Sequence, residues 1–95
     1  MYIIAGLGNP GRQYENTRHN AGFMALDALA DQLGVAVEER KHKALCGKGV
    51  IGGERVLLLK PQTFMNLSGE SIRAAADFYK VEPEHIMVIY DDISK

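Results

Sequence analysis

The sequence lacks the features that would staple a small fold covalently or anchor it in a membrane. Its 95 residues include one cysteine, Cys46, and no tryptophan. A single cysteine cannot form an internal disulfide, so packing must stabilise the fold, and we expect a reducing, cytoplasmic environment. No apolar run approaches the roughly 20 residues that span a bilayer, and the N-terminus has no signal-peptide pattern. These absences exclude a disulfide-rich secreted scaffold and predict no membrane partner.

An excess of charge of one sign is also missing. Eleven Lys and Arg stand against 12 Asp and Glu, which gives a net charge of −1. A protein that holds nucleic acid through charge alone carries a basic excess, so any nucleic-acid contact must be local. The hydrophobic share of 46% and the charged share of 24% are typical of a globular chain. The length allows one domain, which we place at 1–95.

The apolar pattern predicts an α/β fold, because short apolar runs alternate with amphipathic segments. Gly52-Gly53 separates two runs by the spacing of an antiparallel hairpin, and Gly34 occupies the position of a helix C-terminal cap. Ser68 is predicted as the N-cap of the second helix. We expect a mixed, twisted sheet flanked by helices, with strands at 1–7, 45–51, 54–60 and 86–90. The first helix runs from about 19–20 to 33, and the second follows its cap at Ser68 and carries the apolar stripe Ile72, Ala75, Ala76 and Tyr79.

Polar side chains suited to catalysis follow the predicted strands. Ligands of open α/β sheets bind outside the carboxyl ends of the strands, where loops and helix N-termini converge. Taken singly, each such residue is more simply explained as a turn residue, a helix cap or a solvated acid. Taken together, they predict one site at this edge of the sheet, formed by Asn9, Tyr14, Arg18, His19, Thr63, Phe64, Asn66, Asp91 and Asp92.

A histidine paired with an acid provides a general base near neutral pH, because the carboxylate orients the imidazole and stabilises its protonated form. His19 is the histidine beside the predicted edge, whereas His42 and His85 are expected to face solvent. The sequence contains no Gly-x-Ser-x-Gly elbow and no metal-ligand spacing, so water is the simplest nucleophile. Cys46 falls within a predicted strand, where a small buried role is expected.

A competing motif starts at Gly6, since residues 6–11 match G-x-G-x-x-G directly after a strand. This fingerprint would indicate a dinucleotide-binding oxidoreductase if a helix began within the loop and an acid followed the next strand. The turn-like Asn9-Pro10-Gly11 and the absence of an apolar stripe over 12–18 argue against this reading. We rank it below the hydrolytic one.

Four motifs resemble the N-terminal half of bacterial-type peptidyl-tRNA hydrolases. They are Gly6-Leu7-Gly8-Asn9-Pro10-Gly11, then Tyr14 followed by Thr17-Arg18-His19-Asn20-Ala21-Gly22-Phe23, then Lys60-Pro61-Gln62-Thr63-Phe64-Met65-Asn66-Leu67-Ser68-Gly69, and finally Tyr90-Asp91-Asp92. Their order and spacing extend over nearly the whole chain. The resemblance implies an esterase that cleaves the bond between a peptide and the 3′ ribose of tRNA, with peptidyl-tRNA as the partner and no cofactor.

The resemblance also implies roles for individual residues. His19 corresponds to the catalytic base and Asp91 to the acid that stabilises its protonated form. Asn9 corresponds to the residue that separates blocked from free aminoacyl-tRNA. The positions that contact the tRNA end or the peptide are matched by Tyr14, Phe64 and Asn66.

The resemblance covers only the N-terminal half of the family's single domain, so the chain is expected to be truncated and to hydrolyse its substrate poorly. The apolar run 86–90 would lack its later neighbours and is expected to promote self-association, while the full-length form is expected to be a monomer. The charged run 40–43 is read as a solvated surface with local phosphate contact as the alternative. A non-catalytic RNA-binding relative remains the other functional class.

Overall fold

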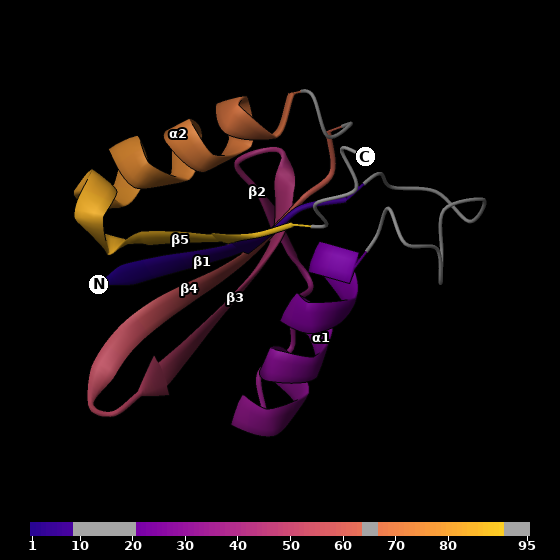
Figure 1. Cartoon of the computed structure of the whole chain (residues 1–95). Helices are drawn as coiled ribbons and strands as arrows, with labels where there is room; N and C mark the ends of the chain where they lie inside the picture. Colours follow the sequence, from indigo (N-terminus) through magenta and orange to yellow (C-terminus); the bar gives the residue numbers. More distant parts are fainter. Residues whose placement is uncertain (9–20, 64–66, 91–95) are drawn as a thin grey trace.

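The computed structural model describes residues 1–8, 21–63 and 67–90. One five-stranded sheet has the order β2-β3-β4-β1-β5, and α1 and α2 lie on its two sides (Figure 1). The elements are β1 (Tyr2–Gly6), α1 (Ala21–Leu33), β2 (Glu39–Lys41), β3 (Ala44–Ile51), β4 (Glu54–Pro61), α2 (Ser68–Tyr79), a short 3₁₀ turn (Pro83–His85) and β5 (Ile86–Ile89).

The sheet is mixed, as predicted. Strand β1 pairs in parallel with β4 on one side and with β5 on the other. Strand β3 pairs antiparallel with both β2 and β4. The turn between β3 and β4 has positive φ at Gly52 (58°) and Gly53 (85°), which is the backbone that a two-residue hairpin of this hand requires. The α/β prediction and the hairpin prediction are therefore confirmed.

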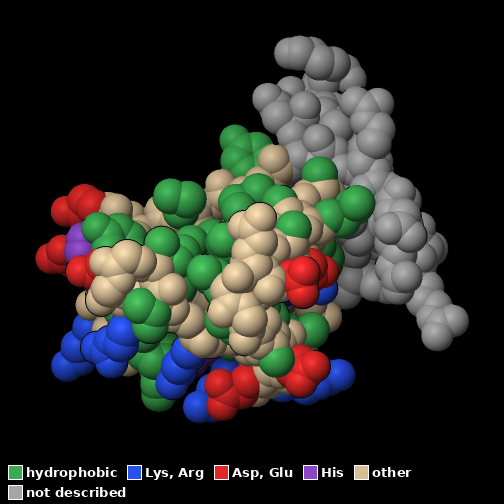
Figure 2. All heavy atoms as spheres, turned by 90° about the horizontal axis from the view of Figure 1, so that it is seen from below, with side chains coloured by type: hydrophobic (Ala, Val, Ile, Leu, Met, Phe, Trp, Pro, Cys, Tyr) green, Lys and Arg blue, Asp and Glu red, His purple; other side chains and the backbone are tan. Residues whose placement is uncertain are grey.

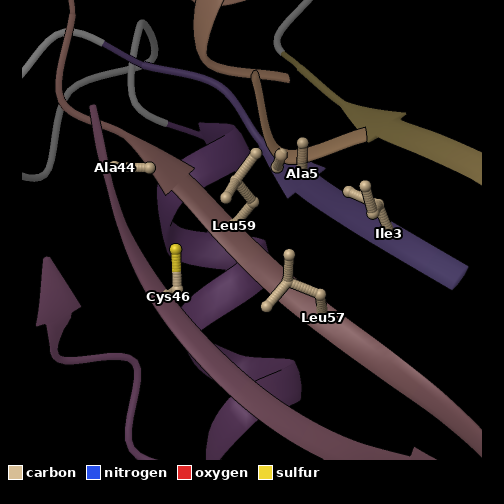
Figure 3. Packing of buried hydrophobic residues seen from close by; sticks show 7 residues of the cluster. Ile3, Ala5, Ala44, Cys46, Leu57 and Leu59 are labelled. Atoms are coloured by element: carbon tan, nitrogen blue, oxygen red, sulfur yellow. The ribbon is translucent and has the colours of Figure 1, made fainter. Parts of the chain in front are cut away.

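Hydrophobic side chains are buried on both faces of the sheet, because β1 and β4 are central and carry apolar residues at successive positions. Figure 3 shows one set projecting from β1, β3 and β4 on the face opposite to α1. Together with Ala75 of α2, that set forms one cluster of Ile3, Ala5, Ala44, Cys46, Leu57 and Leu59. On the other face, Leu26 and Ala30 of α1 form a second cluster with Ile4, Val56 and Leu58.

The predicted N-cap of α2 is wrong. The residue at the cap position is Leu67, with φ −113° and no side-chain hydrogen bond, and Ser68 is already the first helical residue. Its side chain is 2% exposed, so the hydroxyl is turned into the protein and not back over the first turn. Helix α1 begins at Ala21, next to residues 9–20, which are outside the described part of the chain.

Strand β5 is less buried than the other strand next to β1. Met87 is 58% exposed and Tyr90, just beyond the strand, is 60% exposed. The strand stands last in the sheet order, so its outer edge has no neighbour among the described strands.

Figure 2 shows the molecule from below. On this face, hydrophobic side chains gather across the middle, and charged side chains of both signs lie mainly along the border.

Candidate functional site

The three parallel strands end at one edge of the sheet. In the register, Ala5 of β1 is paired with Leu59 of β4, and Gly6 is paired with Ile89 of β5. The strands therefore finish nearly level with one another, and the segments that follow them start side by side. This edge is where the ligand sites of open parallel sheets form, because loops and helix N-termini meet there.

The first turn of α1 packs directly on this edge. A Cβ on Gly22 would lie 2.4 Å from the carbonyl oxygen of Leu7 and 2.5 Å from that of Ile89, so only glycine fits without a shift of the backbone. The ends of β1 and β5 are joined at the same point, where the amide of Leu7 donates a 2.9 Å hydrogen bond to the Ile89 carbonyl. The start of α1 is thus fixed against the ends of two strands.

A lysine at the end of β4 holds α1 from the other direction. The ammonium of Lys60 contacts both carboxylate oxygens of Asp27, at 2.9 and 3.2 Å. It also lies 5.2 Å above the centre of the Phe23 ring, in cation–π geometry. The Lys60 side chain is only 21% exposed, so water screens this ion pair less than an open surface pair. Three strand ends and the α1 N-terminus therefore form one connected framework.

On the opposite face, the turn between β2 and β3 is tied to the end of β4 and to α2. The Ser71 hydroxyl donates a 2.7 Å hydrogen bond to the His42 carbonyl. The amide of Gln62, just after β4, donates one of 2.8 Å to the Lys43 carbonyl. Among the described residues, the buried hydroxyls of Thr63 and Ser68 have no hydrogen-bond partner. This part of the edge is consequently rich in buried polar groups.

Apart from Thr63, the predicted site residues lie just beyond the described residues. The described chain reaches Gly8 and resumes at Ala21, reaches Thr63 and resumes at Leu67, and ends at Tyr90. These five positions frame the carboxyl edge of the sheet. The contact between the imidazole at 19 and the carboxylate at 91 stays a prediction, as do the roles of the six positions Asn9, Tyr14, His19, Phe64, Asn66 and Asp91.

The other two histidines and the cysteine are not part of this edge framework. His42 is half-buried and not freely solvated as expected; burial, and then Lys41, lower the pKa of its imidazole, and Glu39 partly opposes them. His85 stacks on Tyr2 with ring centres 4.3 Å apart and is half-buried as well. Cys46 is buried in β3 as predicted, and burial raises the pKa of its thiol, so it is poorly suited to act as a nucleophile.

Within the described ranges, no group of three or more His, Cys, Asp or Glu side chains is arranged to hold a metal ion. None of the helices that the structure describes is long and apolar enough to cross a membrane.

Two residues of the framework were not singled out by the sequence reasoning. Gly22 lies in the first turn of an amphipathic helix, where glycine costs helix stability, and this is the signal that a backbone approaches closely there. Lys60 gave no comparable signal, because its partner Asp27 is 33 residues away in the sequence. Its role appears only once β4 and α1 are packed together.

Comparison with known proteins gives a consistent result. The family model described as peptidyl-tRNA hydrolase matches residues 3–95. The peptidyl-tRNA hydrolase of Lachnoclostridium phytofermentans is 66% identical over 94 residues, which cover 99% of this chain and 49% of that protein. The one from Alkaliphilus metalliredigens is 64% identical over 93 residues, covering 98% of this chain and 50% of that protein. The chain thus spans about half the length of the curated relatives it matches.

Solved structures agree in fold. The crystal structure of peptidyl-tRNA hydrolase from Acinetobacter baumannii superimposes with a TM-score of 0.93 at 42% sequence identity. The match covers 100% of this chain and 49% of that one. The sheet order and the two helices described above are therefore the arrangement that this relative uses for the corresponding half.

Proposed function

Since the chain belongs to the peptidyl-tRNA hydrolase family, we propose that it carries the hydrolytic half of a site that cleaves the ester between a peptide and the 3′ ribose of tRNA. In this proposal His19 acts as the general base, Asp91 stabilises the imidazolium that forms, and water is the nucleophile. No cofactor is needed, because ester hydrolysis by water requires only proton transfer and stabilisation of the developing oxyanion.

One observation carries the proposal: the first turn of α1 touches the end of β5. Gly22 meets the carbonyl of Ile89, and His19 stands three residues before Gly22 while Asp91 stands two residues after Ile89. Each residue step covers at most about 3.8 Å, so both side chains originate a short way from one shared point. This supports a hydrogen-bonded His–Asp pair without requiring any rearrangement of the sheet.

The remaining residues would serve recognition. Asn9 follows β1 at the same edge, and its side-chain amide can bond to the blocked α-amino group that marks a peptidyl-tRNA. Tyr14 and Phe64 offer aromatic faces on which an unpaired base or ribose of the CCA end can stack. Asn66 can bond to peptide amides. We further propose that a full-length form is monomeric and acts in the cytoplasm.

The test uses residues 1–95 joined to the C-terminal half of the Lachnoclostridium relative, assayed on N-acetylated aminoacyl-tRNA. His19→Ala should lower kcat by about 10²–10⁴-fold, the usual contribution of a general base, while tRNA binding is retained. Asp91→Asn should lower kcat in the same direction, because the imidazolium loses its counter-charge.

The matched control is His85→Ala, which removes an imidazole that stacks on Tyr2 at the opposite end of β5. Its turnover should stay within about twofold of the parent, since it makes no contact with the carboxyl edge. Unchanged turnover in His19→Ala would remove that residue from the mechanism. If the parent protein bound tRNA but did not hydrolyse the substrate, the non-catalytic RNA-binding alternative would be favoured.

A further inference from the structure

A hollow with basic walls lies beside the turn that joins β2 to β3. Its volume is about 320 Å³. It is lined by Arg40, Lys41, His42, Lys43, Ala44 and Gln62, and we call it the basic hollow. Three of these side chains carry a positive charge and none is a carboxylate. The local charge is therefore positive in a protein whose net charge is −1.

The turn at the basic hollow has an unusual and firmly anchored backbone. Lys41 pairs with Ala44, which leaves His42 and Lys43 as the two turn residues, with φ of 57° and 59°. Turns of this hand favour Asn-Gly, because other residues adopt positive φ at a cost. Hydrogen bonds from Ser71 and Gln62 to the two turn carbonyls hold this conformation. The cationic side chains thus project from a rigid base.

The charges of the basic hollow are only partly neutralised. Lys41 is 3.5 Å from Glu39, and Lys43 is 3.1 Å from Glu70. All four of these side chains are about half or more exposed, so the pairs are weak and can exchange a carboxylate for another anion. Within the part of the chain that the structure describes, no salt bridge includes Arg40. The Arg40 guanidinium, which has no carboxylate partner among the described residues, is therefore available to an incoming anion.

An exposed aromatic ring stands next to one of these cations, Lys41. Phe78 of α2 is 63% exposed, and its ring centre lies 5.1 Å from that of His42. The Lys41 ammonium is 5.9 Å from the same ring centre. Surfaces that bind single-stranded RNA combine cations for the backbone with aromatic faces for the bases. The combination favours RNA over an acidic peptide as the occupant.

The basic hollow adjoins the candidate site. Gln62 lines it and follows directly on Pro61, the last residue of β4, at the edge where β1 and β5 also end. A ligand that reaches this edge with its reactive end would pass its neighbouring phosphates close to the β2–β3 turn. From this geometry we infer that the basic hollow binds backbone phosphates of the RNA substrate, an inference that rests on the proposed function.

The experiment measures how salt weakens RNA binding. A fluorescein-labelled RNA hairpin with a single-stranded CCA end is titrated with the chain at several salt concentrations, and anisotropy gives the Kd. The variant combines Arg40→Gln with Lys43→Gln. Each lost phosphate contact reduces the slope of log K against log salt by about 0.7–0.9, so the double variant should lose about 1.4–1.8 from the slope.

A second hollow supplies the matched control. It has a volume of about 310 Å³ and includes Lys48 and Arg55 among its lining residues. In the β3–β4 register these residues lie toward the Gly52-Gly53 turn, away from Gln62. Lys48→Gln with Arg55→Gln removes the same charge and should leave the slope unchanged. Thermal unfolding checks that both variants fold. Arg40→Gln alone, which breaks no described ion pair, repeats the test and should give about half the effect.

The inference is overturned by any of three results: equal slopes for the parent and the basic-hollow variant, equal losses in both double variants, or no binding of the hairpin by a folded parent chain. Tight binding of poly-glutamate through Arg40 and Lys43 without RNA binding would assign the hollow to an acidic protein partner instead. Failure of the proposed function gives a different result. Hydrolysis would be absent, while substitution of Arg40 and Lys43 would still reduce the slope of log K against log salt.

Discussion

At the scale of single residues, a glycine and a histidine show how packing sets what the chain can tolerate. Gly22 brings the backbone of α1 against the strand ends, and the atoms it meets belong to backbone carbonyls, which cannot move aside as a flexible side chain can. His42 is held in a left-handed turn with its Nε2 atom buried and unpartnered among the described residues. Both positions have consequences that can be measured.

Gly22→Ala should destabilise the protein by about 1–3 kcal/mol or more, because the new methyl group overlaps the Leu7 and Ile89 carbonyls. Chemical denaturation gives the free energy of unfolding. Gly69→Ala is the matched control, since nothing lies within 4 Å of its added Cβ, and it should stabilise α2 by roughly 0.5–1 kcal/mol. Equal effects of the two substitutions would contradict the close approach of α1.

His42 should make stability fall in mild acid. Burial lowers its pKa below the ordinary 6.5, so below pH 6.5 the unfolded chain binds more protons than the folded one. The stability that the neutral imidazole of His42 contributes is fully present above pH 6.5. It is lost as the pH falls through the lowered pKa of the folded protein. Melting temperatures recorded from about pH 8 to pH 5 should show this decline.

His42→Asn isolates the effect, because asparagine tolerates positive φ and does not titrate in this range. The variant should show a smaller fall in stability between pH 6.5 and lower pH than the parent. A decline of the same size in both proteins would assign the pH dependence to other groups.

At the scale of elements, the sequence predicted those helices and strands whose bounds are set by residues within or next to them. The β3–β4 hairpin and the end of α1 follow from Gly52, Gly53 and Gly34, whose positions act within a few residues, and both predictions are confirmed. Strand β2 was missed, because the charged run 38–43 has no apolar alternation. It becomes a strand through pairing with β3 and through the distant anchors Ser71 and Gln62.

The same distinction applies to the candidate site. The convergence of strand ends follows from a parallel sheet and could be predicted, whereas the Lys60–Asp27 bridge joins residues that no local pattern connects. The predicted Ser68 cap is wrong because Ser68 is already the first residue of α2 and its side chain is buried instead of capping the first turn. The His19–Asp91 pair lies outside the described residues and remains a proposal.

Strand β5 should drive self-association of the chain. Its exposed Met87 and Val88 sit on the strand that stands last in the order of the described strands, and unpaired backbone groups and apolar side chains on such an edge invite another chain. Met87→Lys should shift the species seen by sedimentation velocity toward the monomer. Met24→Lys, at a 49% exposed position on α1, is the control and should change nothing. A parent chain that is monomeric at every concentration would refute the role of this edge.

At the scale of the whole molecule, the chain supplies one connected half of the fold found in its relatives. The match with the Acinetobacter baumannii structure covers 100% of this chain and 49% of that one. The described strand ends, α1 and the basic hollow form one side of the candidate site. Under the proposed function, positioning of the ester against the nucleophile would also depend on what the rest of such a fold contributes.

Residues 1–95 alone should therefore turn over N-acetylated aminoacyl-tRNA at least about a hundredfold more slowly than the same residues joined to the Lachnoclostridium C-terminal half. A displacement of about 1 Å between reacting groups is enough for a loss of this size. Turnover numbers under saturating substrate make the comparison. Equal turnover would show that the first half contains a complete catalytic site.

The close approach of Gly22 to the Leu7 and Ile89 carbonyls has a further effect on tolerance to sequence change. With no side chain on Gly22, backbone atoms set the spacing between the start of α1 and the ends of β1 and β5 at this point. Replacing one apolar core residue by another, such as Leu26 by Met, should therefore change the free energy of unfolding. The separation between the start of α1 and the end of β5 should stay the same. Changes of sequence in the core can therefore accumulate in this protein without separating the first turn of α1 from the end of β5.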